Sequence, residues 1–372
     1  MKATFCGIHM NTQDDQKAEI SRGRFDPVNT PYEVHEGSFP RNGSPEEQFG
    51  FLLRYVVLAP STHNTQPWKF ALSREGIEIY GDYTRRMPVV DPGNREMLMS
   101  IGAAVFNLRV AAAHFGMRCR VDYNLSGDSE RPLAFARLEP SLPHAPEDPA
   151  VGALFPYLTM RHTTRAPFLL TRIPASILER LAAIGERGRA SLQLSTDGAL
   201  NSKIAGLVAE AERAQLADQE FRKDLAGWIR PEGSEHEDGV TAASLGLQGP
   251  ASMLAPYITR TMDLGNVRAA QDKNLCVDAP ALAVILGEDS VPHWLDAGEM
   301  LEQLLLTVVR EGLHFSYFNL PIHVPEYRAR IRGLLGASVW PQLLLRIGYC
   351  LAMPPRTPRR PLEEVMITAR AV

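Results

Sequence analysis

Hydrophobic residues recur at helical spacing in two long stretches of the chain, and a short apolar run follows each stretch. The first stretch begins after Asp91 and ends at Gly116. The second extends from Asp296 to Gly312 with a similar repeat. We therefore predict two long helices, followed by strands at residues 119–123 and 314–318.

Shorter patterns add a further helix and several strands. Residues Ser44 to Glu47 (SPEE) form a capping box with proline at the first helical position, so we expect a helix that begins there and ends before Pro60. Asp296 to Glu299 (DAGE) is an acidic variant of this box and predicts the start of the second long helix. The remaining strands are predicted at residues 69–72, 77–80, 281–286 and 343–349.

The glycines of the two long helices have the same spacing. Gly102 and Gly116 in the first are separated by the same interval as Gly298 and Gly312 in the second. Two unrelated helices can share this punctuation, because glycine commonly ends helices. The alternative is an internal duplication, in which one chain carries two copies of an α/β unit.

Composition and charge argue against several classes of protein. The 372 residues carry a net charge of −4 without a basic block, which does not favour nucleic-acid binding. The 4 cysteines lie far apart and form no C-x-x-C pair, so we expect neither a disulfide framework nor a metal site. The sequence shows no apolar run of about 20 residues and no signal-peptide pattern. We therefore expect no membrane segment and a cytoplasmic protein.

The segment LAPSTHNTQPWKFAL, residues 58–72, combines a turn-forming proline with many polar side chains and two aromatic residues. A buried strand would not contain so many polar groups, and a flexible loop would not need Trp68 and Phe70. Asn64 and Gln66 supply amide donors and acceptors. We infer a backbone held against a planar ligand with polar edges, and we expect Trp68 to lie in the core behind it.

Two basic clusters lie far from this segment in the sequence. RHTTRAPF occupies residues 161–168, and RTPRRP occupies residues 356–361. Guanidinium groups and hydroxyls of this kind are good ligands for a phosphate. Each cluster alone could equally be a solvated basic surface.

Together these segments resemble a known superfamily. Residues 60–68 match the P-S-x-x-N-x-Q-P-W motif of the FMN-dependent nitroreductases, and residues 161–165 are similar to that family's R-x-S-x-[RK] motif, with Thr163 in place of serine. Residues 341–361 resemble the family's C-terminal strand and phosphate-binding tail. The resemblance implies an α+β fold, with antiparallel-rich central sheets flanked by helices, and FMN as the cofactor.

The order of the motifs resembles the fused, twin-domain branch of this superfamily, which includes the Acg-like proteins. In ordinary nitroreductases the arginine motif comes first, and FMN lies between two subunits. Here each half carries complementary motifs, which implies a nitroreductase-like fold duplicated in one chain, a pseudo-dimer with one FMN. We expect a monomer or a homodimer, with an N-terminal extension at residues 1–43, a first half at 44–150 and a second half at 151–372.

The resemblance also implies roles for individual residues. Pro60 and Ser61 would bring backbone against the flavin, and Arg165 would place a positive charge near flavin N1 and O2, where it favours electron uptake. Arg161 and Thr163 would contact the phosphate or the ribityl chain. No catalytic side chain is assigned, because the chemistry is centred on the flavin. The expected cofactor-binding residues are Pro60, Ser61, Thr62, Asn64, Gln66, Arg161, His162, Thr163, Arg165, Arg359 and Arg360.

The implied function is that of an oxidoreductase. Hydride or electrons would pass through flavin N5 from NAD(P)H, or from a substrate, to a small organic acceptor. The alternative is a non-catalytic protein that binds and sequesters FMN beneath a lid. Residues 231–250 are the candidate lid, although they could also form a solvated acidic loop. A serine hydrolase is not favoured, because no G-x-S-x-G surrounds Ser61. A dedicated dinucleotide-binding fold is not indicated either, because no G-x-G-x-x-G follows a strand.

Overall fold

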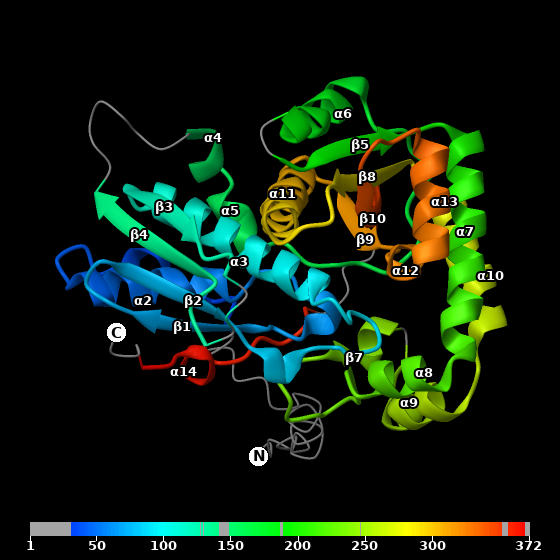
Figure 1. The fold of residues 1–372 in the computed structure, drawn as a ribbon, viewed down its shortest axis with the longest axis horizontal. Coiled ribbons are helices and arrows are strands. Elements are labelled where there is room, and N and C mark those ends of the chain that lie inside the picture. The colour runs from blue at the N-terminus through cyan, green and yellow to red at the C-terminus, as the bar shows by residue number, and fades with distance from the viewer. Residues whose placement is uncertain are drawn as a thin grey trace, which may run out of the picture.

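The computed structural model of the protein describes residues 31–126, 128, 130–140, 149–186, 189–245, 247–351 and 356–368. Most of the predicted N-terminal extension therefore lies outside the described residues. Two four-stranded antiparallel sheets form the centres of two halves, and two long helices lie between them (Figure 1). The predicted α+β class, with antiparallel sheets flanked by helices, is confirmed.

The first sheet begins after the capped helix α2 (Pro45–Val56). The predicted capping box is present: Ser44 Oγ accepts a hydrogen bond from Glu47 N (3.2 Å), and the Glu47 carboxylate accepts one from Ser44 N (2.7 Å). The strand order is β1-β2-β4-β3. The elements after α2 are η2 (Thr62–Asn64), β1 (Trp68–Leu72), β2 (Gly76–Gly81), η3 (Tyr83–Arg85), α3 (Arg95–His114), β3 (Met117–Tyr123) and β4 (Ala134–Pro140).

The second sheet repeats this topology, with the order β5-β8-β10-β9. In each sheet a long helix leads to the strand at the far edge: α3 connects β2 to β3, and α11 connects β8 to β9. Two sheets with the same strand order support the predicted duplication. The elements are α6 (Ala175–Ala182), η4 (Ala183–Glu186), β5 (Ser191–Ser195), β8 (Ala281–Gly287), α11 (Val291–Arg310), β9 (His314–Tyr317) and β10 (Trp340–Gly348).

The second half carries two insertions relative to this shared plan. The larger lies between β5 and β8 and the smaller between β9 and β10. The larger contains α7 (Gly198–Ala217), α8 (Gln219–Ala226), β6 (Ile229–Arg230), β7 (Val240–Thr241), η5 (Ala242–Leu245), α9 (Pro250–Thr261) and α10 (Gly265–Val277). The smaller contains α12 (Leu320–His323) and α13 (Pro325–Leu335). Short elements elsewhere are η1 (Glu36–Ser38), α4 (Pro149–Gly152), α5 (Phe155–Leu158) and α14 (Leu362–Val365).

The two long helices cross at a pair of glycines. A Cβ on Gly102 would overlap the carbonyl of Leu295, and a Cβ on Gly298 would overlap the carbonyl of Met99. When the glycines of the two helices are aligned, Met99 is equivalent to Leu295, so each helix makes the same contact with the other. This reciprocity is the mark of a twofold interface, which here lies within one chain.

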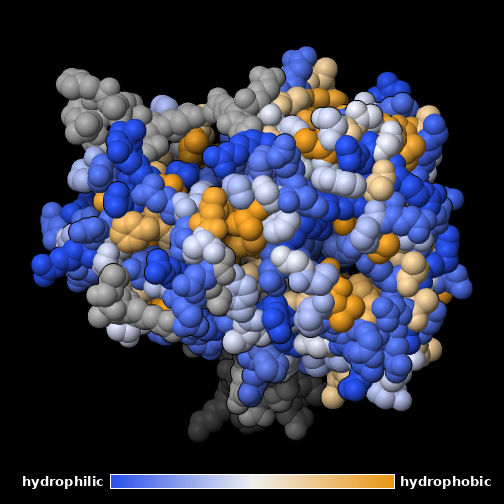
Figure 2. Space-filling view, viewed as in Figure 1, coloured by the Kyte–Doolittle hydropathy of each residue, from blue (hydrophilic) through white to orange (hydrophobic). Residues whose placement is uncertain are grey.

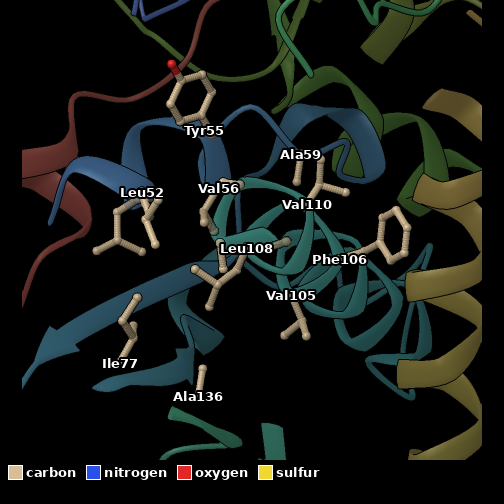
Figure 3. Packing of buried hydrophobic residues seen from close by; sticks show 14 of the residues in the cluster. Leu52, Tyr55, Val56, Ala59, Ile77, Val105, Phe106, Leu108, Val110 and Ala136 are labelled. Atoms are coloured by element: carbon tan, nitrogen blue, oxygen red, sulfur yellow. The ribbon is translucent and has the colours of Figure 1, made fainter. Parts of the chain in front are cut away.

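The core of the first half packs α2 and α3 on one face of the first sheet. Figure 3 shows Leu52 and Val56 of α2 near Leu108 of α3, with Ile77 of β2 and Ala136 of β4 below them. These residues are all fully buried. The predicted position of Trp68 in this core is also confirmed, because its side chain is 0% exposed.

The second long helix begins earlier than the sequence pattern predicts. The helix α11 starts at Val291 with Pro292 in its first turn, so the predicted capping box at residues 296–299 is wrong. Glu299 serves a different purpose: its carboxylate accepts a hydrogen bond from Arg109 Nε of α3 at 2.7 Å. The acidic residue therefore links the two long helices rather than capping one of them.

The C-terminal segment leaves the second half and packs on the first (Figure 1). Within residues 356–368, Ile367 N donates to Phe70 O of β1 at 2.8 Å. The side chain of Arg359 donates to the Leu58 carbonyl at 3.2 Å. The halves are therefore joined by this returning segment as well as by the α3–α11 crossing.

One described helix, α3, is long and apolar enough to span a membrane, which the sequence analysis did not expect. In the structure, 83% of its apolar stretch is buried. Its composition is explained by its place between the two sheets, where both faces need apolar side chains. The face of the molecule in Figure 2 is mostly hydrophilic, with separate apolar patches.

Candidate functional site

The loop between α2 and β1, residues 57–67, has an unusual backbone. His63, Asn64 and Gln66 have φ angles of 49°, 56° and 51°, in the left-handed region that residues other than glycine rarely adopt. Ser61 Oγ accepts a hydrogen bond from Gln66 N (2.9 Å) across the loop. Asn64 Nδ2 donates to the carbonyl of Pro358 in the C-terminal segment (3.0 Å). Backbone strain of this kind persists only where surrounding contacts fix it, and it concentrates at ligand sites.

Two buried arginines hold the loop from behind. Arg161 Nη2 donates to the carbonyl of Leu58 (2.8 Å), and Arg359 Nη1 donates to Asn64 Oδ1 (2.9 Å). Arg161 also forms an ion pair with Glu302 of α11, with 3.2 Å between Nε and the carboxylate. Burial raises the pKa of Glu302 to about 7, although the charges of Arg161 and Arg359 oppose that rise.

A cavity of about 630 Å³ lies where the two halves meet. Met99 of α3 and Leu301 of α11 form part of its wall. Nine of the expected cofactor-binding residues line this cavity: Pro60, Ser61, Thr62, Asn64, Arg161, His162, Thr163, Arg165 and Arg359. The structure therefore brings together residues from three segments that are far apart in the sequence.

Two of the expected residues do not line the cavity. Gln66 is 0% exposed, and its side chain accepts a hydrogen bond from Arg360 N (2.8 Å) and donates one to the Glu237 carbonyl (2.8 Å). The guanidinium of Arg360 is directed to the Glu364 carboxylate (3.2 Å). Both residues therefore fasten the C-terminal segment to the loop.

Arg165 is the motif residue that projects most freely into the cavity. Its side chain is exposed within the cavity that it lines, because the cavity is open to solvent. Within the part of the chain that the structure describes, its one side-chain hydrogen bond goes from Nη1 to Ser244 Oγ, at 3.3 Å. A cation with one weak contact is available to a ligand.

Glu96, His323 and Asn319 form a polar cluster in the cavity wall that the motifs did not predict. The Glu96 carboxylate, from α3, accepts hydrogen bonds from Thr62 Oγ1 (2.7 Å) and from Asn319 Nδ2 (3.4 Å), and it lies 2.7 Å from His323 Nε2. Burial alone would raise the pKa of Glu96, but the His323 charge and hydrogen bond, together with Arg95, lower it to about 2. No local sequence signal marks this cluster, because its members come from both halves.

The Tyr317–Leu320 segment runs from the end of β9 to the start of α12. These residues line the cavity, and the hydroxyl of Tyr317 is buried without a hydrogen-bond partner among the described residues. His323 Nδ1 and Arg359 Nε are likewise buried without a hydrogen-bond partner among the described residues. Buried polar atoms are normally satisfied, so unpartnered atoms around a cavity indicate a ligand that would pair with them.

The candidate lid at residues 231–250 is attached to the loop. Gly239 N donates to the carbonyl of Asn64 (3.2 Å), and Asp238 forms ion pairs with Arg85 and with Arg230, the latter at 2.8 Å. Within this segment, Val240 and residues 243–245 line the cavity. This segment therefore covers one side of the cavity.

Within the described residues, no group of three or more His, Cys, Asp or Glu side chains is placed to hold a metal ion. The cavity lining contains five arginines together with hydroxyls, amides and three carboxylates, and the arginines are suited to an organic anion.

No protein-family model matches the chain. Curated relatives do match, and over most of its length. Over 322 residues, which are 85% of this chain and 90% of the relative, it is 29% identical to a Mycobacterium tuberculosis protein named "Putative NAD(P)H nitroreductase". It is 25% identical to "Putative NAD(P)H nitroreductase acg" of the same organism, over 82% of this chain and 91% of the relative.

The resemblance to nitroreductases is confirmed. A third nitroreductase relative, "Probable NAD(P)H nitroreductase PigM" of a Serratia species, is 25% identical over 88% of this chain and 96% of its own. At this coverage the nitroreductase similarity extends over both halves.

Solved structures give weaker matches. NfnB of Mycobacterium smegmatis, an FMN-dependent nitroreductase solved with NADPH, is 15% identical, with a TM-score of 0.39 over 60% of this chain and 99% of its own. An iodotyrosine deiodinase with FMN and 3-iodo-L-tyrosine is 14% identical, with a TM-score of 0.38 over 58% and 97%. Similarities of this size do not decide the fold, for which the strand order of the two sheets is the direct observation.

Proposed function

We propose that this protein is an FMN-dependent oxidoreductase of the nitroreductase type, which takes electrons from NAD(P)H and passes them to a small organic acceptor. The observation that carries the proposal is the convergence of the loop, the arginine motif and the returning segment on one cavity between the halves. The names of the curated relatives support the reaction class.

The charge and the hydrogen-bonding groups at the junction, where the two halves meet at the cavity, suit FMN. Two buried guanidinium groups, Arg161 and Arg359, face the single carboxylate of Glu302, whose pKa of about 7 leaves it partly protonated at neutral pH. The excess positive charge suits a phosphate. The unpartnered Tyr317 hydroxyl and Arg359 Nε would gain hydrogen-bond partners from a bound cofactor.

FMN would supply the electron-transfer chemistry that protein side chains lack. The chain's own residues would hold and tune it. Pro60, Ser61 and Asn64 present the strained loop to the cavity. Arg165 supplies a cation that favours negative charge on the ring system, so it would raise the reduction potential of the cofactor.

The test of this function is an anaerobic titration of the purified protein with NADH and with NADPH. We expect flavin absorbance in the purified protein and its bleaching by at least one nicotinamide. Recovery of the absorbance on adding a nitroaromatic would complete the cycle. Protein that carries no flavin, and does not take up added FMN, would refute the proposal.

The second candidate is a protein that binds FMN without catalysis, and one observation favours it. The segment at residues 231–250 is tied to the loop by Asp238 and Gly239 and covers one side of the cavity. If this segment excludes nicotinamide, the flavin would be present but not bleached. Asp238→Asn should then weaken the attachment to Arg85 and Arg230 and allow the nicotinamide to bleach the flavin. If the site is already open, the substitution should change the bleaching little.

We also propose that a single chain forms the complete site. Both sets of motif residues come from the same chain, and the α3–α11 crossing takes the place of a subunit interface. Sedimentation or light scattering of the flavin-loaded protein measures this directly.

A further inference from the structure

The larger insertion of the second half forms one wall of the cavity. The helices α7 and α10 pack against each other beside the second sheet (Figure 1). They contribute six residues to the lining of the cavity: Glu212, Leu216, Arg268, Gln271, Asp272 and Leu275. In the described part of the first half, no helix intervenes between β1 and β2, so the first half has no counterpart of this wall.

Arg346 of β10 faces the same end of the cavity and is only 1% exposed. Its guanidinium lies over the ring of Phe168, at 4.0 Å from the centroid, and its Nη2 donates to the carbonyl of Ala166 (2.9 Å). Its Nε and Nη1 are buried without a hydrogen-bond partner in the described part of the chain. A buried guanidinium with two free donors is costly unless an anion pairs with it.

Among the residues that the structure describes, no carboxylate forms an ion pair with Arg346. The charge of Asp272 acts on Arg346 from a distance, and burial lowers the pKa of Arg346 to about 10, so the guanidinium stays protonated at neutral pH. Glu212 does not compensate either. It is 3% exposed, its Oε2 has no partner among the described residues, and burial next to Asp272 raises its pKa to about 8.

Cations therefore exceed anions at this end of the cavity. With Arg165 assigned to the flavin, Arg268 and Arg346 are opposed by Asp272, because the raised pKa of Glu212, about 8, leaves it mostly protonated at neutral pH. The phosphate expected for the cofactor is assigned to a different set of residues, Arg161 and Arg359, which hold the loop. The positive charge at the α7–α10 wall is left for another ligand.

We propose that the α7–α10 wall and Arg346 form a subsite for an anionic group, such as a carboxylate, carried by the electron acceptor. Arg346 pairs with the anion through its two free nitrogens, and Arg268 flanks it. The inserted helices therefore select negatively charged acceptors. This inference rests on the proposed function, and it names the class of substrate for that site.

The test uses two probes of nearly the same shape, 4-nitrobenzoate and 4-nitrobenzamide. Their binding to the oxidised protein, as purified and without reductant, is measured by calorimetry. We expect the wild type to bind 4-nitrobenzoate at least about tenfold more tightly, because a charge-assisted hydrogen bond adds roughly 1.5–3 kcal/mol. Arg346→Gln should remove this preference and leave binding of 4-nitrobenzamide and the FMN content unchanged.

Arg330→Gln is the matched control, because this arginine of α13 is paired with Glu210 on the outer surface and does not line the cavity. It should preserve the preference. Equal binding of the two probes to the wild type would overturn the subsite, and this result needs no variant. Equal weakening of both probes in Arg346→Gln, or loss of FMN with the preference intact, would also overturn it.

Arg268→Gln gives a second variant in case Arg346→Gln does not fold, and it should weaken 4-nitrobenzoate selectively. The two proposals fail in different ways. A protein whose flavin is bleached by a nicotinamide but which shows no anion preference retains the proposed function and loses the subsite. A protein without flavin loses the proposed function, whatever anion it binds.

Discussion

The two halves of the molecule share one plan but differ in what is added to it. Each has a four-stranded antiparallel sheet with the same strand order and a long helix that leads to the edge strand. Among the described residues, only the second half inserts four helices, α7 to α10, between the strands β5 and β8 of its sheet, and two more, α12 and α13, between β9 and β10. The shared long helices meet at the α3–α11 crossing. The inserted elements of the second half contribute part of the cavity lining.

The duplicated elements and the insertions contribute differently to the site. The duplicated elements create a junction, and the loop, the arginine motif and the returning segment reach the cavity from both sides of it. The insertions supply the α7–α10 wall and the segment over the loop, which have no counterpart in the first half. Changes in the shared parts should therefore affect stability and cofactor binding, and changes in the insertions should affect access and choice of acceptor.

The largest expected effect follows from the helix crossing. Gly298→Ala would force a Cβ into the carbonyl of Met99, so we expect a loss of roughly 2–3 kcal/mol in the free energy of unfolding. Gly206→Ala is the matched control, since this glycine of α7 has nothing within 4 Å of its Cβ position. It should be neutral or stabilising by up to about 1 kcal/mol. Denaturant unfolding measures both, and equal effects would argue against close packing at the crossing.

A comparable effect should appear at the polar bridge between the halves. The pKa of Glu96 is about 2 in the folded protein against 4.5 for a free side chain, so ionised Glu96 stabilises the fold above about pH 4.5. This stabilisation is lost as the pH falls towards 2, because the unfolded chain binds the proton more readily. Glu96→Gln should lower the free energy of unfolding by about 2–3 kcal/mol at pH 7.

The difference between wild type and Glu96→Gln should then shrink as the pH falls from about 4.5 towards 2. Denaturant unfolding across this range measures it. Glu210→Gln, which removes an exposed ion pair with Arg330, should change stability by less than about 1 kcal/mol at any pH. A Glu96→Gln deficit that stays constant at low pH would show that the pair with His323 is not the cause.

A smaller effect is expected on cofactor affinity, from residues on opposite sides of the junction. Asn64→Ala in the first half and Arg161→Ala in the second should each weaken FMN binding about ten- to hundredfold, the size of one charge-assisted contact. Because Arg161→Ala leaves Glu302 without its partner, the double variant Arg161→Ala/Glu302→Gln separates loss of binding from loss of folding. Wild-type affinity in both single variants would contradict a site between the halves.

The sequence predicts a structural feature well when the contacts that determine it are between neighbouring residues. The capping box at Ser44 and the glycine spacing of the long helices depend on neighbouring residues, so they could be recognised directly. The start of α11 was misplaced because Glu299, which looked like a cap, pairs with Arg109 of another helix. That contact exists only after the halves have come together.

In the candidate site, too, local motifs could be recognised from the sequence, whereas contacts between distant segments could not. Nine of the eleven residues that the three motifs indicated line the cavity, but the motifs did not give the direction of each side chain: Gln66 and Arg360 bind each other behind the wall. The Glu96–His323 contact and the position of Arg346 opposite α10 are set by the tertiary fold. Neither leaves a pattern along the sequence.

The central claim is that two similar halves form one cofactor site, and the ratio of FMN to chain tests it most directly. The flavin released on denaturation is quantified against protein, and the native mass is measured on the same sample. We predict about one FMN per chain, because the loop motif lies in the first half and the arginine motif in the second. A ratio near two, or no flavin after incubation with excess FMN, would contradict the account.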